Sequence, residues 1–267
     1  MNPDFIESNN YEKFLNFIEK EIDSNEFQRQ LKKVQNIDLK HYTKFINILE
    51  MRRYLNEYKN EPLIKNDINK VLIILPGNPE IVFKLCLEAI RYNVTMTISI
   101  EDFCLAQNTL LVEVVNKVIE KCKLKNKINL KNMLSDVEII EQSKNVDKTI
   151  IIGNSNTYNR LENRIRNLEL NSYGIFEIYS DSEEFESLER TVYDYLVQNE
   201  FESELYDDIE FEDAIKLINK KGYGFCSILL SKDKEKQKIF KENIKSKYVI
   251  VNKNPFKEIK FKLEIKK

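Results

Sequence analysis

The sequence is poor in the residues that build metal centres and disulfides. Its 267 residues include one histidine, His41, and four cysteines, Cys86, Cys104, Cys122 and Cys226, without a Cys-x-x-Cys pair. Zinc sites need cysteine and histidine ligands at close spacing, so we expect no metal. The scattered thiols also predict no disulfides in a reducing compartment.

Long apolar runs are missing as well, and neither positive nor negative charge is in large excess. No stretch reaches the roughly 20 residues of a membrane span, and the first residues carry an acidic group where a signal peptide needs a basic one. We therefore expect a cytoplasmic protein without a membrane partner. The 42 Lys and Arg nearly balance the 44 Asp and Glu, which does not favour nucleic acid as a partner.

Apolar residues are present in an amount that suffices for one large core or two modest ones, at 42% of the chain. Within residues 1–66 they recur at spacings of three and four, as in Phe14, Phe17, Ile18 and Ile22. This spacing predicts an N-terminal helical region.

From residue 67 the pattern alternates between strands and helices. A long helix is expected at 104–122, and another helical segment at 158–168. Apolar, β-branched runs predict strands at 70–75, 94–100, 136–140 and 148–152. Such alternation implies parallel strands with right-handed crossovers, so we predict an α/β fold with a Rossmann-like doubly wound parallel sheet over residues 67–198.

Residues 199–267 predict a truncated second α/β lobe. Their first part, 199–212, is acidic and expected to be mostly loop. The elements expected after it are helices at 212–219 and 233–243 and strands at 224–230 and 247–252. Over 257–267 apolar and charged residues alternate, which predicts a one-sided strand suited to a sheet edge.

Three segments of this last part follow an order found in a known family. Segment 211–219 contains Ala214-Ile215 and ends in Asn219, segment 223–233 begins Tyr-Gly-Phe, and segment 248–252 reads Tyr-Val-Ile-Val-Asn. They resemble, in order and spacing, the Ala-Ile helix, the Tyr-Gly-Leu strand and the Val-x-Val-Asn strand of the aldehyde dehydrogenase superfamily.

The first half resembles the same family. Segment 75–79, Leu-Pro-Gly-Asn-Pro, is similar to its Pro-Trp-Asn turn, and segment 89–93 to the Ala-Leu-x-x-Gly-Asn before its second strand. Segment 146–154 is similar to the strand that ends in Gly-Ser over the nicotinamide dinucleotide. The resemblance covers roughly residues 67–255 and implies an oxidoreductase fold with NAD or NADP as cofactor.

The departures from the family concern its chemistry. Family members hold a Gly-Gln-x-Cys nucleophile between a glutamate-bearing loop and the Ala-Ile helix, but Glu169 and Ala214 are too close in sequence to contain that stretch. The family's cofactor-binding lysine aligns with Ile98, and a glycine of its phosphate loop aligns with Tyr158. The resemblance therefore implies the fold and argues against catalysis through a thiohemiacetal.

Five residues are candidates for a site. Asn78 aligns with the family's oxyanion-hole amide and Glu169 with its general base; the alternatives are a helix-capping turn residue and a solvated carboxylate. Gly153, Asn154 and Ser155 lie between a strand and a helix, where backbone N–H groups either bind a cofactor phosphate or form a simple turn. The cysteines are expected to be buried and structural.

Three functions remain open on these grounds. The first is an aldehyde dehydrogenase-like protein without thiohemiacetal catalysis. The second is an NAD(P)-dependent oxidoreductase acting on an aldehyde, acyl-CoA or acyl phosphate with Asn78 and one of the cysteines. The third is an interaction subunit that forms a homo-oligomer or pairs with a full-length homologue through the strand at 257–267.

Overall fold

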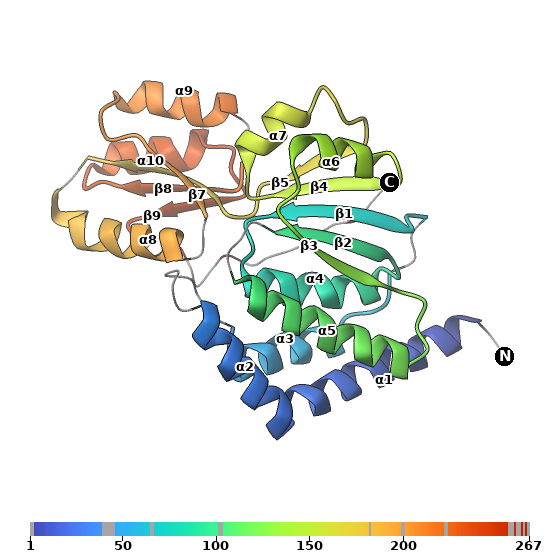
Figure 1. Ribbon diagram of the computed structural model, residues 1–267. Helices are drawn as coiled ribbons and strands as arrows, with labels where there is room; N and C mark the ends of the chain where they lie inside the picture. Colours follow the sequence, from blue (N-terminus) through green and yellow to red (C-terminus); the bar gives the residue numbers. More distant parts are fainter. Residues whose placement is uncertain are drawn as a thin grey trace. The chain divides into compact units, whose positions relative to one another are not determined.

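The computed structural model shows an α/β chain with two parallel sheets (Figure 1). It describes residues 3–38, 46–64, 67–100, 104–181, 183–198, 201–221, 224–255, 259, 263 and 265. The chain divides into a first unit (1–151, 158–169 and 263–267) and a second unit (152–157 and 170–262). In the described part, no helix is both long and apolar enough to cross a membrane.

The first unit is built on a five-stranded sheet with the order β3-β2-β1-β4-β5. Its strands are β1 (Lys70–Leu75), β2 (Thr95–Ile100), β3 (Ile128–Asn132), β4 (Lys148–Ile152) and β5 (Leu168–Asn171). Val71 lies opposite Met96 of β2 and Lys148 of β4, both in parallel register. This strand order, with its reversal between β1 and β4, is that of a doubly wound Rossmann-like sheet, so the predicted fold class is confirmed.

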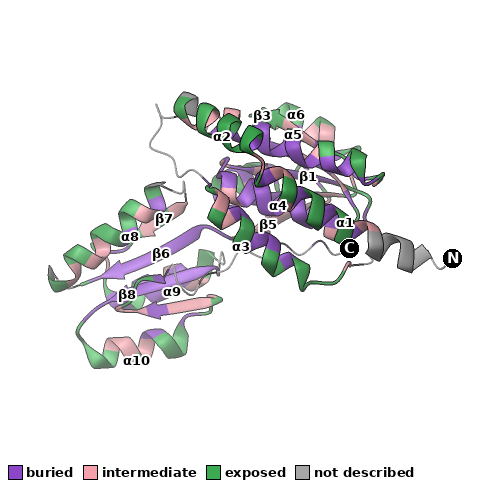
Figure 2. Ribbon diagram, turned by 90° about the horizontal axis from the view of Figure 1, so that it is seen from below, coloured by how far each residue is buried: buried purple, intermediate pink, exposed green. Residues whose placement is uncertain are grey.

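Helices cover this sheet in layers. Figure 1 shows α4 (Pro79–Arg91) and α5 (Leu105–Lys121) on one face of the sheet and α6 (Asp136–Ser143) on the other. A second helical layer, α1 (Pro3–Ile22), α2 (Asn25–Asp38) and α3 (Ile48–Lys59), packs on α4 and α5. Strands β1, β2 and β4 and most residues of α4 are buried, while the edge strands β3 and β5 are partly exposed; Figure 2 colours buried residues purple. The predicted N-terminal helices are therefore present, and they bury apolar area against the Rossmann-like part.

The predicted strand at 136–140 is wrong, because these residues form helix α6. The Ser135 side chain accepts a hydrogen bond from the backbone of Glu138, and the Glu138 carboxylate accepts one from the backbone of Ser135. This capping box satisfies two backbone groups at the helix start, which outweighs the β preference of Val137 and its neighbours. The strand of this region is β3, eight residues earlier in the chain.

The second unit contains a four-stranded parallel sheet with the order β7-β6-β8-β9. Its strands are β6 (Ile175–Ser180), β7 (Glu202–Leu205), β8 (Cys226–Leu230) and β9 (Tyr248–Val251), and its helices are η1 (Glu183–Phe185), α8 (Glu186–Gln198), α9 (Phe211–Lys221) and α10 (Lys234–Asn243). The sheet thus begins with β6, whereas the predicted domain boundary fell between residues 198 and 199. Strand β7 lies where the sequence predicted mostly loop.

The predicted strand at 257–267 lies mostly outside the described residues. Leu263 and Ile265, which are described, are each 1% exposed. The Leu263 carbonyl accepts a hydrogen bond from the Tyr92 hydroxyl at 3.2 Å. These two side chains therefore pack within the first unit.

The second sheet buries one carboxylic acid, Glu177 in β6, which is 1% exposed. One of its oxygens accepts a hydrogen bond from the Ser227 hydroxyl at 2.9 Å, and Ser227 in turn contacts Ser246 at 2.6 Å. Burial, followed by the nearby Glu204 carboxylate, raises the pKa of Glu177 to about 7 despite Ser227 and Lys221, which act in the opposite direction. Below about pH 7 the folded protein therefore holds Glu177 mainly as the protonated acid.

This raised pKa predicts a pH-dependent stability. Because the folded value lies above the unfolded one, the stabilisation is complete below about pH 4.5 and is lost as the pH rises through about 7. We expect Glu177→Gln, which mimics the neutral acid, to remove this dependence and to stabilise the protein by on the order of 2–3 kcal/mol at pH 8. Urea unfolding at pH 5 and pH 8 measures the free energy of unfolding of the wild type and of the variant.

The matched control is Glu242→Gln, which changes an exposed carboxylate of the same unit. It should leave the difference between pH 5 and pH 8 as in the wild type. A Glu177→Gln protein with the wild-type pH dependence would contradict the assignment of the proton to Glu177.

Candidate functional site

The candidate oxyanion-hole residue, Asn78, is the N-cap of helix α4. Its side-chain oxygen accepts a hydrogen bond from the Glu80 backbone N–H at 2.9 Å, and its carbonyl accepts one from Val82 at 3.0 Å. The turn before it is held from α5, because the buried Asn108 amide donates to the Gly77 carbonyl at 2.6 Å. Asn78 thus performs the capping role that the Pro-Gly-Asn-Pro sequence also predicts.

The candidate general base, Glu169, lies in strand β5. Its carboxylate forms an ion pair with the Lys148 ammonium group at 2.5 Å, and its side chain is 43% exposed. A general base that takes up a proton near neutral pH needs a dry surrounding that destabilises its charged form. Glu169 is instead ion-paired and partly open to solvent, so its surroundings are not of this dry kind.

The structure does not bring Asn78 and Glu169 together. Strand β4 lies between β1 and β5, which places the backbones of those two strands about 10 Å apart at the usual strand spacing. Asn78 follows the carboxyl end of β1, while the Glu169 carboxylate turns toward Lys148, the first residue of β4. The pair therefore does not form a catalytic constellation in the first unit.

The candidate cofactor loop, residues 153–155, is a well-defined turn within the second unit. Gly153 has a φ of +64° and donates its N–H to the Asn171 carbonyl at 3.0 Å. A Cβ at this position would lie 2.8 Å from the Tyr173 carbonyl oxygen, so only glycine fits. The Asn154 side chain accepts a hydrogen bond from Thr157 at 2.8 Å and caps α7 (Ser155–Leu161).

Two groups of this loop that could bind an anion, the backbone N–H and the hydroxyl of Ser155, already bind a carboxylate. The Ser155 backbone N–H donates to one carboxylate oxygen of Glu202 at 2.8 Å, and the Ser155 hydroxyl donates to the other. A nucleotide phosphate at this loop would have to displace a carboxylate that makes two hydrogen bonds. The loop as it stands therefore does not fit a dinucleotide phosphate.

Glu202 was missed by the sequence analysis. It lies 47 residues after Ser155, at the start of β7, in a segment whose many acidic residues look alike. The only available signal was the alternation of Glu202, Ser203, Glu204 and Leu205, which is typical of an edge strand. Such a pattern indicates a strand but does not identify the partner of an individual carboxylate.

The four cysteines are buried and free. Burial raises the pKa of the Cys86 thiol to about 12 and also raises that of Cys122. Catalytic cysteines act as thiolates and are partly exposed, so neither residue has the properties of a nucleophile. Across the described residues, no three side chains of the metal-binding types lie close enough together to hold a metal ion.

Solved structures with similar folds were found, while no protein-family profile and no curated protein matches the sequence. The γ-glutamyl phosphate reductase from Thermotoga maritima has a TM-score of 0.57 and 10% identity over 92% of this chain and 83% of that chain. The NADP-dependent glyceraldehyde-3-phosphate dehydrogenase from Bacillus halodurans, complexed with NADP, has a TM-score of 0.53 and 11% identity over 96% of this chain and 80% of that chain.

An indole-3-acetaldehyde dehydrogenase in its apo form has a TM-score of 0.52 and 12% identity over 95% of this chain and 73% of that chain. All three neighbours are members of the aldehyde dehydrogenase superfamily, and this chain is short compared with them. The chain has the aldehyde dehydrogenase fold. The resemblance drawn from the sequence motifs is thus confirmed for the fold, whereas function does not follow from a fold alone.

The tight turn at Gly153 gives a direct test of the loop geometry. We expect Gly153→Ala to destabilise the second unit by about 1–3 kcal/mol, because the added methyl group meets a backbone oxygen and alanine disfavours a positive φ. Urea unfolding followed by circular dichroism measures the change. Asn156→Ala, at an exposed position two residues after Asn154, is the control and should change stability by less than about 0.5 kcal/mol.

Proposed function

We propose that this chain is an aldehyde dehydrogenase-like protein that does not catalyse aldehyde oxidation through a thiohemiacetal and acts instead as an interaction subunit. The observation that carries the proposal is the Glu202 carboxylate on Ser155. It fills the loop with which an enzyme of this fold would hold a cofactor phosphate. The protein thus keeps the fold while its own side chain satisfies the binding groups.

Two further observations support the absence of thiohemiacetal chemistry. The Cys86 thiol is fully enclosed, with its pKa raised to about 12, so it does not form a thiolate near neutral pH. Glu169 is an ion-paired surface residue, separated from Asn78 by a strand. The three parts of the family's mechanism, nucleophile, base and oxyanion donor, are therefore not assembled by these residues.

The alternative function is an NAD(P)-dependent oxidoreductase acting on an aldehyde, acyl-CoA or acyl phosphate. It is supported by neighbours whose structures contain NADP or NAD. In this alternative Glu202 would leave Ser155 when the cofactor binds. The charge-assisted hydrogen bonds of Glu202 oppose that movement, which is why the non-catalytic function is preferred.

A titration with NADH and NADPH distinguishes the two functions. We expect no saturable binding at concentrations up to about 1 mM, because the loop groups that would bind phosphate are occupied. Nicotinamide fluorescence measures binding, and the B. halodurans NADP-dependent glyceraldehyde-3-phosphate dehydrogenase, whose structure contains NADP, serves as the reference protein for NADPH. Saturable binding together with reduction of an acyl phosphate or acyl-CoA would establish the oxidoreductase instead.

The buried thiols give a second test. In native protein we expect all four cysteines to react with an aromatic disulfide reagent at least about 100-fold more slowly than in urea, because the thiolate is the reactive form and the thiols are enclosed. The released chromophore gives the rate. One thiol that reacts at the unfolded rate in native protein would point to a nucleophile and contradict the proposal.

The interaction role predicts that the chain does not work alone. We expect light scattering after size exclusion to give at least the mass of a dimer for the pure protein, or a stable complex once a full-length homologue is added. A protein that stays monomeric at about 100 µM and binds no homologue would contradict this part of the proposal.

A further inference from the structure

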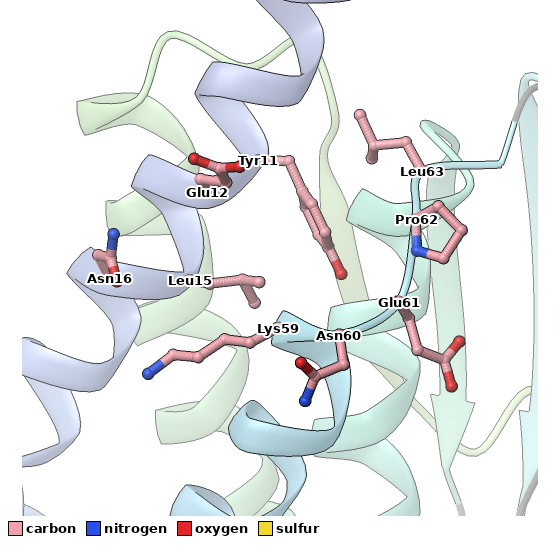
Figure 3. Close-up of a pocket in the computed structure, with 9 residues that line it drawn as sticks. All are labelled: Tyr11, Glu12, Leu15, Asn16, Lys59, Asn60, Glu61, Pro62 and Leu63. Carbon is pink, nitrogen blue, oxygen red and sulfur yellow. The ribbon is translucent and has the colours of Figure 1, made fainter.

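A pocket opens on the N-terminal helical layer, away from every residue discussed as a catalytic candidate. It lies between α1 and the chain that follows α3, with a volume of about 450 Å³. Figure 3 shows Tyr11, Leu15 and Asn16 on the α1 side and the segment 59–63 on the other. The volume is within the range of small-molecule sites, which is about 300–1,000 Å³.

Polar contacts, two of them buried, hold the walls of the pocket. The Tyr11 hydroxyl donates to the Tyr58 carbonyl at 3.3 Å, and the Tyr58 hydroxyl donates to the Glu88 carboxylate at 2.8 Å. Arg91 binds Glu88 at 3.1 Å, Glu61 at 2.6 Å and the Pro62 carbonyl at 3.2 Å. Burial raises the pKa of Glu88, although Tyr58 and Arg91 counteract it. These contacts tie α1, α3, α4 and the segment 61–62 together, so the pocket is preformed.

The charges that remain available in the pocket are negative. The Lys59 ammonium group is held by both Glu19 carboxylate oxygens at 2.8 Å, so it is not available to a ligand. Glu12 has no hydrogen-bond or ion-pair partner among the described residues. Glu61 uses one carboxylate oxygen for Arg91, and its side chain is 47% exposed. A cation in the pocket would therefore meet the unpaired Glu12 carboxylate and the second carboxylate oxygen of Glu61.

The end of helix α3 adds to this negative potential. The helix ends at Lys59, with Asn60 as its C-cap, and both border the pocket. The carboxyl end of a helix carries a partial negative charge, which favours a cation there. The Asn60 side-chain nitrogen donates to the Asn56 carbonyl at 2.9 Å, which leaves its oxygen as an acceptor toward a ligand.

Apolar surface lies beside these acceptors. Leu15 on α1 and Pro62 and Leu63 on the opposite wall line the same pocket, together with the Tyr11 ring. Figure 3 shows the Tyr11 side chain extending between the two walls. A ligand that matches both features carries a positive charge at one end and a short hydrocarbon chain at the other.

We propose that this pocket binds a small organic cation, an alkylammonium of a few carbon atoms. Its ammonium group lies at Glu12 on the α1 wall, and its chain extends past the Tyr11 ring toward the exposed Pro62 on the opposite wall. The site is independent of the loop at residues 153–155 and of the function proposed for the chain. It assigns a ligand to the helical layer that covers α4 and α5.

The probe for this proposal is n-butylammonium, with butyrate and butanol as matched ligands of opposite and no charge. We expect n-butylammonium to bind with a dissociation constant in the millimolar range, as is usual for a ligand of five heavy atoms. In two-dimensional NMR of the ¹⁵N-labelled full chain, the shifts should be confined to residues 10–18 and 57–64. Butyrate and butanol should each bind at least about tenfold more weakly.

Two variants make the test specific. Glu12→Gln, at an exposed position, should weaken binding of n-butylammonium about tenfold through loss of the ion pair. Glu113→Gln, an exposed carboxylate on α5 outside this pocket, should leave binding unchanged. The proposal is overturned by no binding at about 100 mM, by equal binding of butyrate, by shifts elsewhere in the chain, or by an unchanged affinity in Glu12→Gln.

Discussion

The burial of the parallel strands is the constraint on which the rest of this structure depends. The central strands β1 and β4 of the first unit and β6 and β8 of the second are almost entirely enclosed. A polar group inside such a strand is costly unless it is hydrogen-bonded, so binding groups are restricted to strand ends and to the outer helices. Glu177 is a carboxylic acid buried inside one of these strands, and its proton together with the Ser227 hydroxyl reduces the cost.

At the strand ends, the polar groups are satisfied by the chain itself. Asn78 caps α4, Asn108 holds the turn before it, and Glu202 takes both donors of Ser155. The aldehyde dehydrogenase fold is present at 10–12% identity, because different apolar residues with the same pattern pack into a similar core. The chemistry needs individual residues, and here those positions have structural partners.

The sequence predicted most of the fold because its signals are local. The apolar runs of β1 and β4 and the spacing along α5 identify their elements directly. The strand predicted at 136–140 was wrong because β-branched residues in it were given more weight than the capping box at Ser135, a signal that was also present in the sequence. Whether a segment forms a helix or a strand can thus be predicted from the sequence where one local signal dominates.

The candidate site was predicted only in part, because its decisive contacts connect residues far apart in the chain. The glycine turn and the cap at Asn154 follow from local sequence, but the Glu202 carboxylate reaches Ser155 from another element. The same holds for Glu177, whose hydrogen-bond partner lies 50 residues later on a neighbouring strand. No periodicity or composition contains this information, since it arises from strand order and register.

The helical layer of the first unit offers a place for a ligand pocket when the polar groups at the strand ends already have partners in the chain. Helices α1 to α3 add a surface, and contacts of Arg91 with Glu61 and Pro62 hold segment 61–62 against α4. Arg91 binds Glu88 below the pocket and Lys59 binds Glu19 at its rim, so both of these cations are paired with other carboxylates. The negative charge of the pocket therefore follows from the same ion pairs that hold its walls, and the stability of the layer and its preference for a cation have one physical origin.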